Sequence, residues 1–203
     1  MIKMGFKIVR AIVRMFLMFV FRIKIYGKEN MPTEGGAIVV INHRSNWDVV
    51  IAGITSPRKL GFMAKAELFE CKPLGMLITA LGAFPVQRGK GDIGAIKAAL
   101  TRLRKEEIVA MFPEGKRVKD NESVTAKPGA VMLAHKAKVP IIPIKLTGKY
   151  RWMSKINVVI GTPITLEEYY DEKLTVEQLQ ELTDGMMNNL RSLDKAIVAK
   201  EKE

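Results

Sequence analysis

The chain has 203 residues and carries 33 lysines and arginines against 21 aspartates and glutamates, a formal net charge of +12. A chain of this length can bury one continuous core without disulfides or a structural metal. Its single cysteine and two histidines give neither an internal disulfide nor a zinc-binding pattern. We therefore expect one domain in a reducing, cytosolic compartment, with no metal and no cofactor. The basic balance favours an anionic partner, but charge alone does not choose between nucleic acid, phosphorylated small molecules and a membrane surface.

The first 24 residues are both basic and apolar. They contain six lysines and arginines, no acidic residue, and an uninterrupted apolar run from Met15 to Phe21. That run is far shorter than the roughly 20 residues needed to cross a bilayer. A basic helix rich in Phe, Leu and Met suits a membrane interface, while a core-packed helix and a cleaved or spanning segment are the alternatives. We divide the chain into a basic amphipathic membrane-interface segment, residues 1–26, and a folded domain, residues 27–203.

Strand and helix signals alternate after the loop at residues 27–36. The alternation predicts an α/β fold, a single domain with a largely parallel central sheet flanked by helices. The expected strands cover residues 37–41, 60–65, 83–87, 108–112, 141–146 and 156–160. The expected helices cover residues 45–55, 67–81 with an interruption near Pro73 and Gly75, 93–103 after a cap at Asp92, and 129–137.

The last expected helix begins with a capping box formed by Thr175 and Gln178 and presents an apolar stripe that should pack on the domain. Two reactive residue types lie elsewhere. His135 falls on the helix at residues 129–137 and is interpreted as structural. Cys71 has no neighbouring histidine in the sequence that would activate it, so we expect it to have a packing role.

The first candidate catalytic stretch runs from Asn42 to Asp48, directly after the strand at residues 37–41. Functional groups of α/β sheets collect where strands end. If His43 lies in the loop and Asp48 in the first helical turn, Asp48 can accept the Nδ1–H and leave Nε2 to take a proton from an alcohol or thiol. A substrate hydroxyl facing a thioester would then need no protein nucleophile. The alternative is a capping box from Ser45 to Asp48, with His43 an ordinary loop residue.

A second polar stretch, residues 111–117, also follows an apolar strand. Gly115 allows a tight turn close to a ligand, while Lys116 and Arg117 offer positive charge and a guanidinium fork suited to phosphate. A plain surface turn would have a similar composition.

Two further basic residues follow predicted strands. Residues 82–89 end a strand on Arg88, which either holds a phosphate or is solvated. Lys65, the last residue of the strand at 60–65, is another phosphate candidate, with simple exposure as the alternative.

The order and spacing of these stretches resemble the four conserved blocks of the glycerolipid acyltransferase family. His43 and Asp48 match the histidine and aspartate that this family separates by four residues. Joint occurrence of the blocks is far more specific than any single motif. The chain departs from the family pattern at Lys116 and Val118, where the family often has threonine and serine. The resemblance covers roughly residues 35–160, and its other three blocks correspond to residues 82–88, 112–117 and 139–143.

The resemblance implies transfer of a fatty-acyl group from acyl-CoA or acyl carrier protein to the 2-hydroxyl of 1-acylglycerol 3-phosphate (lysophosphatidic acid), which forms phosphatidic acid in phospholipid biosynthesis. In such an enzyme His43 is the general base and Asp48 orients it. The resemblance also implies that Pro143 shapes the acyl-donor side. The residues implied to bind the glycerol phosphate acceptor are Arg88, Glu114, Gly115 and Arg117, with Lys65 and Lys116 as further candidates.

The partners implied are lysophosphatidic acid, the acyl thioester and an anionic membrane surface, with a peripheral or monotopic location on the cytoplasmic face of the cell membrane. Two alternatives are another glycerol phosphate or lysophospholipid acceptor, and a non-catalytic membrane-surface scaffold. Nucleic acid is not expected as a partner, because the sequence has no RNP-like aromatic strand, zinc finger or comparable recognition signature.

Overall fold

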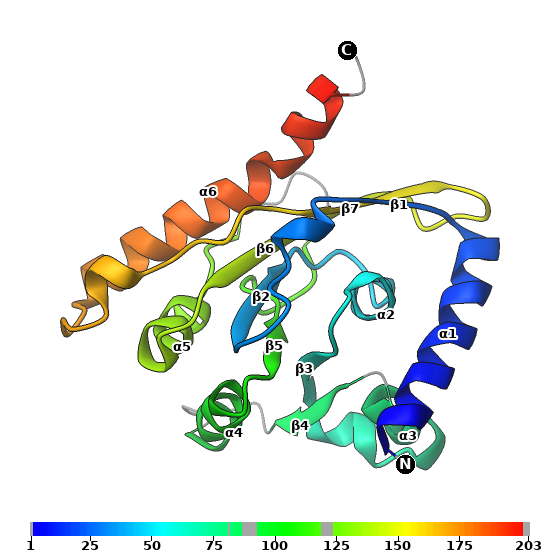
Figure 1. Cartoon of the computed structure of the whole chain (residues 1–203), viewed down its shortest axis with the longest axis horizontal. Coiled ribbons are helices and arrows are strands. Elements are labelled where there is room, and N and C mark those ends of the chain that lie inside the picture. Colours follow the sequence, from blue (N-terminus) through cyan, green and yellow to red (C-terminus); the bar gives the residue numbers. More distant parts are fainter. Residues whose placement is uncertain (1, 81, 87–92, 119–123, 201–203) are drawn as a thin grey trace.

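Seven strands form one sheet in the order β1-β7-β6-β2-β5-β3-β4, and helices cover both of its faces (Figure 1). This computed structural model describes residues 2–80, 82–86, 93–118 and 124–200. The strands are β1 (Arg22–Tyr26), β2 (Ala37–Ile41), β3 (Leu60–Lys65), β4 (Phe84–Val86), β5 (Ile108–Met111), β6 (Ile141–Gly148) and β7 (Lys155–Ile160). The α-helices are α1 (Ile2–Val20), α2 (Trp47–Thr55), α3 (Lys72–Ala80), α4 (Ile93–Arg104), α5 (Gly129–Ala137) and α6 (Val176–Lys200).

Five strands of the sheet, β6, β2, β5, β3 and β4, run parallel to one another. Strand β7 is antiparallel to β6, and β1 is parallel to β7, so these two strands run in the opposite direction at one edge. The predicted fold, a single α/β domain with a largely parallel sheet flanked by helices, is confirmed.

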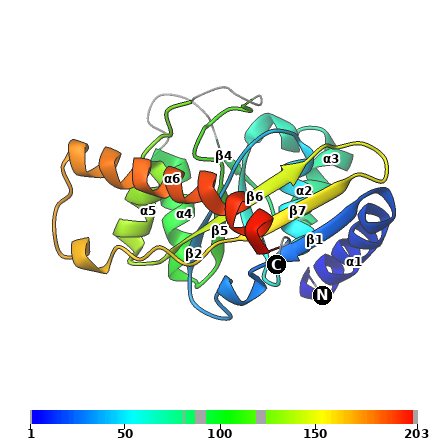
Figure 2. The same ribbon diagram turned by 90° about the horizontal axis from the view of Figure 1, so that it is seen from above.

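Strand β2 lies between two hydrophobic cores, because alternate side chains of a strand point to opposite faces. Ala37, Val39 and Ile41 join the core under α1, α2 and α3. Ile38 and Val40 join the core under α4, α5 and α6. The two helical layers lie on opposite sides of the sheet in Figure 1, and Figure 2 shows the same arrangement from above. Burial on both faces explains why β2 is a continuous apolar run instead of an alternating one.

Helix α1 presents two apolar stripes. Leu17 and the adjacent Phe21 are buried in the core, and Val13 and Val20 pack against it. The other stripe is exposed and consists of Ile12, Met15, Phe16 and Phe19. Spacings of three and four residues place these four side chains together on one helix face. Within the described part of the chain, no helix has the length and hydropathy needed to span a bilayer.

The predicted helix at residues 67–81 is wrong at its start. A 3-10 turn, Ala66–Phe69, comes first, and α3 begins only at Lys72. Pro73 therefore lies in the first turn of α3, where a helix does not need the missing N–H, and it does not interrupt the helix. Cys71 precedes α3 and is exposed, so its predicted packing role is also wrong.

The start of α6, strand β1 and the expected cap of α4 compare differently with the predictions. The capping box at the start of α6 is confirmed, because Thr175 N–H donates to Gln178 Oε1 (2.9 Å) and Gln178 N–H donates to Thr175 Oγ1 (3.2 Å). Strand β1 was not predicted, since its apolar residues alternate with Arg22 and Lys24 within a segment dominated by the helical pattern of α1. Asp92, the expected cap of α4, lies outside the described residues.

Candidate active site

The site lies where the carboxyl ends of β2 and β5 meet, because these two strands are parallel neighbours. The chain leaves β2 toward α2 on one face of the sheet and leaves β5 toward α5 on the other. Such a point, where connections depart to opposite faces, is where open α/β sheets form their ligand crevice. The two loops that flank it are residues 42–46 and 112–118.

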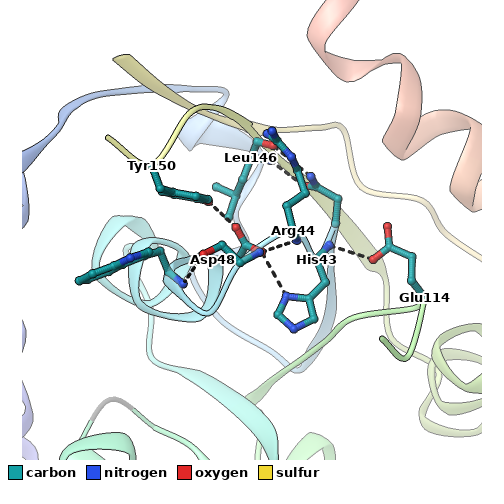
Figure 3. A network of polar contacts seen from close by, with 9 residues as sticks. His43, Arg44, Asp48, Glu114, Leu146 and Tyr150 are labelled. Carbon is teal, nitrogen blue, oxygen red and sulfur yellow. Dashed lines mark hydrogen bonds and ion pairs between the residues drawn. The ribbon is translucent and has the colours of Figure 1, made fainter. Parts of the chain in front are cut away.

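His43 and Asp48 lie together at this end of the sheet (Figure 3). His43 is in the loop after β2, and Asp48 is the second residue of α2. The predicted contact is present, with 3.1 Å between His43 Nδ1 and Asp48 Oδ2. The Asp48 side chain is fully buried, whereas that of His43 is 17% exposed. The imidazole is therefore oriented by a buried carboxylate and still reaches solvent.

Asp48 accepts bonds from several donors. Its Oδ2 atom accepts the backbone N–H groups of Arg44 and Ser45, both at 2.6 Å, in addition to contacting His43. Its Oδ1 atom accepts the hydroxyl of Tyr150. These donors replace the water that a carboxylate loses on burial. The Ser45 bond is one half of the alternative capping box, so capping the loop and orienting His43 are tasks of the same carboxylate.

The loop after β5 holds His43 from the other side. The rings of His43 and Phe112 are stacked, with centroids 4.0 Å apart and an interplanar angle of 24°. The backbone N–H of His43 donates to Glu114 Oε2 (2.8 Å), and Val118 N–H donates to the His43 carbonyl (2.8 Å). Burial raises the pKa of Glu114 above its ordinary value, and the bond from His43 N–H opposes that rise.

The neighbouring strand β6 supports the loop through side chains. Asn42 Nδ2 donates to the Leu146 carbonyl (3.0 Å), and Leu146 N–H donates to Asn42 Oδ1 (2.7 Å). The Asn42 amide thus continues the β2–β6 pairing beyond Ile41 by imitating a peptide group. Arg44 donates from its guanidinium to the carbonyl of Gly148, the last residue of β6 (3.1 Å).

Tyr150 is a member of the site that sequence reasoning missed. It follows β6, and its hydroxyl reaches Asp48 from 102 residues further along the chain. Burial, followed by the charge of Asp48, raises the pKa of Tyr150, which keeps the phenol protonated as a donor. The available signal was a cluster of aromatic residues, Tyr150 and Trp152, between two strands. A single sequence does not indicate which distant residue such a cluster contacts.

Four predicted substrate-binding residues lie in the loop that holds His43, and Glu114, which accepts the His43 N–H, is the first of them. Gly115 has a φ of +67°, a left-handed conformation that favours glycine, and donates its N–H to the Phe112 carbonyl (3.0 Å). Lys116 and Arg117 follow it and are exposed. Glu114 and Val118 both bond to the backbone of His43, and the two cationic residues lie between them in the chain.

For the other three predicted substrate-binding residues, no side-chain contact with the loops around His43 is observed in the described part of the chain. Arg88 lies outside the described residues. Lys65 ends β3 opposite Val86, at the same edge of the sheet as His43, but its side chain is not described. Pro143 is buried inside β6, where it pairs with Val40. Its carbonyl accepts the N–H of Gly161 (2.8 Å), so its observed contacts are those of a core residue.

The geometry is suited to general-base chemistry at His43 Nε2. A carboxylate on Nδ1 fixes the imidazole tautomer that leaves Nε2 able to accept a proton. The stacked ring of Phe112 limits rotation of the imidazole, and the two bonded loops fix its backbone. Together these contacts hold a partly buried imidazole in one orientation.

The comparisons with known proteins agree with this chemistry. Residues 22–147 match the family described as Acyltransferase. A 1-acyl-sn-glycerol-3-phosphate acyltransferase of Bacillus subtilis (strain 168) is 30% identical over 178 residues, 85% of this chain and 88% of that protein. One of Streptococcus pneumoniae is 32% identical over 164 residues, 77% of this chain and 60% of that protein.

A solved structure shares the fold. The crystal structure of the 1-acyl-sn-glycerophosphate (LPA) acyltransferase PlsC from Thermotoga maritima aligns with a TM-score of 0.71 and 23% sequence identity, over 94% of this chain and 79% of that one. The family match runs from the first residue of β1 to the penultimate residue of β6 and includes both loops that hold His43. The family match over residues 22–147 and the 30% identity to the Bacillus subtilis relative show that the chain belongs to the acyltransferase family.

Proposed function

We propose that this enzyme transfers a fatty-acyl group from an acyl thioester, carried by coenzyme A or acyl carrier protein, to the 2-hydroxyl of 1-acylglycerol 3-phosphate. The product is phosphatidic acid, a step of phospholipid biosynthesis. The observation that carries the proposal is the contact between His43 Nδ1 and the buried Asp48 carboxylate. The Bacillus subtilis and Streptococcus pneumoniae relatives are named for acylation of 1-acyl-sn-glycerol 3-phosphate, which supports the choice of acceptor.

In the proposed reaction, His43 Nε2 takes the proton of the acceptor hydroxyl as its oxygen attacks the thioester carbonyl. The C–O bond forms and a tetrahedral oxyanion results. The C–S bond then breaks, and the imidazolium returns its proton to the departing thiolate. One ester and one free thiol are produced, so no protein nucleophile is required. Asp48 stabilises the imidazolium that exists between the two proton transfers.

We assign recognition of the acceptor phosphate to four cationic residues, Lys65, Arg88, Lys116 and Arg117. Support comes from Lys116 and Arg117, which are exposed and follow the turn at Gly115 in the loop bonded to His43. Glu114 would act on the site by holding the His43 backbone. Any influence of Pro143 on the acyl donor would act through the position of β6, because Pro143 is buried there.

A lipid acceptor implies that the enzyme works at a membrane, and we propose a peripheral or monotopic association with the cytoplasmic face of the cell membrane. The exposed apolar stripe of α1 supports this, since it is a continuous apolar surface on a helix that carries basic residues and no acidic ones. Residues 1–26 are the proposed membrane-interface segment and residues 27–203 the proposed acyltransferase domain, with the last part of that segment, β1, paired to β7 of the sheet.

The test measures thiol release from oleoyl coenzyme A and from oleoyl acyl carrier protein, with 1-acylglycerol 3-phosphate and vesicles present. We expect acceptor-dependent release by the wild type and a loss of at least about 10³-fold in His43→Ala. His135→Gln is the matched control, because it changes the other histidine, whose Nε2 contacts the Tyr169 carbonyl (2.6 Å) far along the chain.

Two outcomes would contradict the proposal. Wild-type release that does not depend on the acceptor would mean that the enzyme does not acylate this lipid. Equal activity of His43→Ala and wild type would mean that His43 is not the base. Mass spectrometry of the lipid product identifies phosphatidic acid and separates it from products of any other acceptor.

A further inference from the structure

Exposed aromatic and basic side chains gather at the turn between β6 and β7, residues 149–154. Trp152 and Met153 are 64% and 50% exposed, which is unusual for residues this large and apolar. Lys149 and Arg151 are exposed beside them. The turn contains no acidic residue. Its composition therefore combines a large apolar surface with positive charge.

The turn is fixed to the end of α1. Met153 N–H donates to the Val20 carbonyl (2.8 Å), and Arg22 N–H donates to the Ser154 carbonyl (3.0 Å). The ring of Trp152 contacts that of Phe19 edge to face, with centroids 5.4 Å apart. Phe19 is itself 68% exposed and belongs to the exposed stripe of α1. Figure 1 shows the turn beside the carboxyl end of α1. The stripe and the turn thus form one continuous surface.

We propose that the β6–β7 turn enters the headgroup region of an anionic bilayer together with the exposed stripe of α1. This inference rests on the proposed function, because a lipid acceptor requires a docked enzyme. Aromatic side chains prefer the membrane interface, and lysine and arginine bind anionic headgroups. A stripe and a turn joined by hydrogen bonds would fix the orientation of the domain, whereas a single helix lying on the surface would leave it free to rock.

The proposed orientation also suits the chemistry. The turn follows the carboxyl end of β6, and β6 is parallel to β2, so the turn lies at the same edge of the sheet as His43. Tyr150, within the turn, contacts Asp48 directly. Docking through this surface would bring the end of the sheet that carries His43 toward the bilayer that holds the acceptor.

The two tryptophans of the chain, Trp47 and Trp152, allow a direct test. In Trp47→Phe, Trp152 is the only tryptophan, and its emission is measured with phosphatidylcholine–phosphatidylglycerol vesicles. We expect a shift to shorter wavelength on binding and quenching by lipids brominated on the upper part of the acyl chain. In a bound protein, unquenched and unshifted Trp152 emission would overturn the role of the turn.

Vesicle cosedimentation provides the second measurement. The double variant Trp152→Ser with Met153→Ser should bind about tenfold or more weakly than wild type, because it removes two large apolar side chains from the lipid contact. The matched control is Ile93→Ser with Val176→Ser, which removes two apolar residues that are 65% and 77% exposed on α4 and α6, in the helical layer on the other side of the sheet. Equal binding of both double variants would overturn the proposal.

Turnover of a monomeric short-chain lysophosphatidate without vesicles separates this inference from the proposed function. The Trp152 and Met153 double variant should keep its activity on that substrate while losing activity on vesicles. If the wild type turns over the soluble substrate but does not bind anionic vesicles, the docking surface is refuted and the proposed reaction stands. If it binds vesicles and transfers no acyl group, the reaction is refuted instead.

A separate observation carries a second inference, about how Asp48 is held. The contacts from His43, Arg44 and Ser45 all reach Oδ2, whereas the hydroxyl of Tyr150 reaches Oδ1. Rotation about the Cβ–Cγ bond moves both oxygens, so the bond from Tyr150 at Oδ1 adds to the restraint that the three contacts at Oδ2 already impose. We infer that Tyr150 is a positioning residue, which fixes the Asp48 carboxylate in the plane that His43 requires.

The test is Tyr150→Phe, which keeps the ring contact with Phe21 (centroids 6.0 Å apart) and removes only the hydroxyl. We expect kcat to fall about tenfold with KM unchanged for both substrates, since one hydrogen bond in a preorganised site is worth about that factor. In an Asp48→Asn background the same change should have almost no effect, because the hydroxyl acts through Asp48.

Tyr170→Phe is the control. The Tyr170 ring lies against Lys138 and packs on the core under α4, α5 and α6, on the face of the sheet opposite to α2. Wild-type kcat in Tyr150→Phe would mean that the tyrosine serves only through its ring, and would overturn the inference. A full additional loss in the Asp48→Asn background would overturn it as well.

Discussion

The loop that carries His43 and the turn between β6 and β7 lie at the same edge of the sheet, yet they are held in different ways. In the loop, the Asp48 carboxylate bonds to residues three to five positions away, so the contacts close within one short segment. In the turn, Tyr150 reaches the same carboxylate across 102 residues. The local network depends on the spacing of residues in the sequence, whereas the distant contact depends on the whole sheet placing β6 beside β2.

The largest effect is expected at the point where the two regions meet. In Asp48→Asn, an amide with a single oxygen replaces two acceptor atoms that serve His43, two backbone N–H groups and a phenol. The NH₂ group of the amide cannot accept a hydrogen bond from the Nδ1–H of His43, so the required imidazole tautomer is lost. We expect kcat to fall by about 10³-fold or more, as for aspartates that orient a histidine base elsewhere. Thiol release under saturating substrates measures it.

The control for this variant is Asp184→Asn, which removes an exposed carboxylate from α6. It should retain wild-type activity. If Asp48→Asn were folded by circular dichroism and also retained wild-type kcat, the His43–Asp48 pair would not be the catalytic base system, and the local network would serve only to shape the loop.

A smaller effect is expected where β6 supports the loop. Asn42→Ala removes both bonds to the Leu146 backbone and leaves its N–H and carbonyl without their partner in a buried part of the sheet. Two such losses predict a decrease of about 2–4 kcal/mol in the free energy of unfolding. Urea denaturation measures it, with the exposed Asn188→Ala on α6 expected within about 0.5 kcal/mol of wild type. A decrease below about 1 kcal/mol in Asn42→Ala would show that this bridge does not support the loop.

The difference between these regions also explains what the sequence could predict. Strands β2, β3 and β5 were predicted within one residue, because each is a short, mainly apolar run bounded by loop signals. The contact of His43 with Asp48 was predicted from their separation and from the expected start of α2. In both cases the information lies within a few neighbouring residues.

The rest depends on contacts that no short segment contains. Strand β1 alternates basic and apolar residues because it lies at the edge of the sheet, and it pairs with β7, more than 130 residues later. The support given by Asn42 and Tyr150 depends on β6 lying next to β2. The stacking of Phe112 on His43 likewise requires β5 to be the other neighbour of β2. A single sequence gives strand existence but not strand order, and so it did not reveal these contacts.

The smallest effect is expected at Glu114, which joins the loops at residues 42–46 and 112–118 by accepting the backbone N–H of His43. Burial raises the pKa of Glu114 above its ordinary value of 4.5. The folded protein therefore holds this proton more tightly than the unfolded chain, so the stability it contributes is complete below the ordinary pKa and is lost as pH rises through the folded pKa. Glu114→Gln cannot titrate, and its amide oxygen can still accept the His43 N–H.

The free energy of unfolding of wild type minus that of Glu114→Gln should consequently decrease as pH rises from about 4 to neutrality, because only the wild type must bury a charge at the higher pH. Urea denaturation across this range measures the difference, and Glu181→Gln on the exposed side of α6 controls for the change in net charge. Since the bond to His43 is preserved, kcat should fall by less than about tenfold. A difference that increases with pH would mean that the bond to His43 N–H outweighs burial, and that Glu114 strengthens the junction of the two loops through its charge.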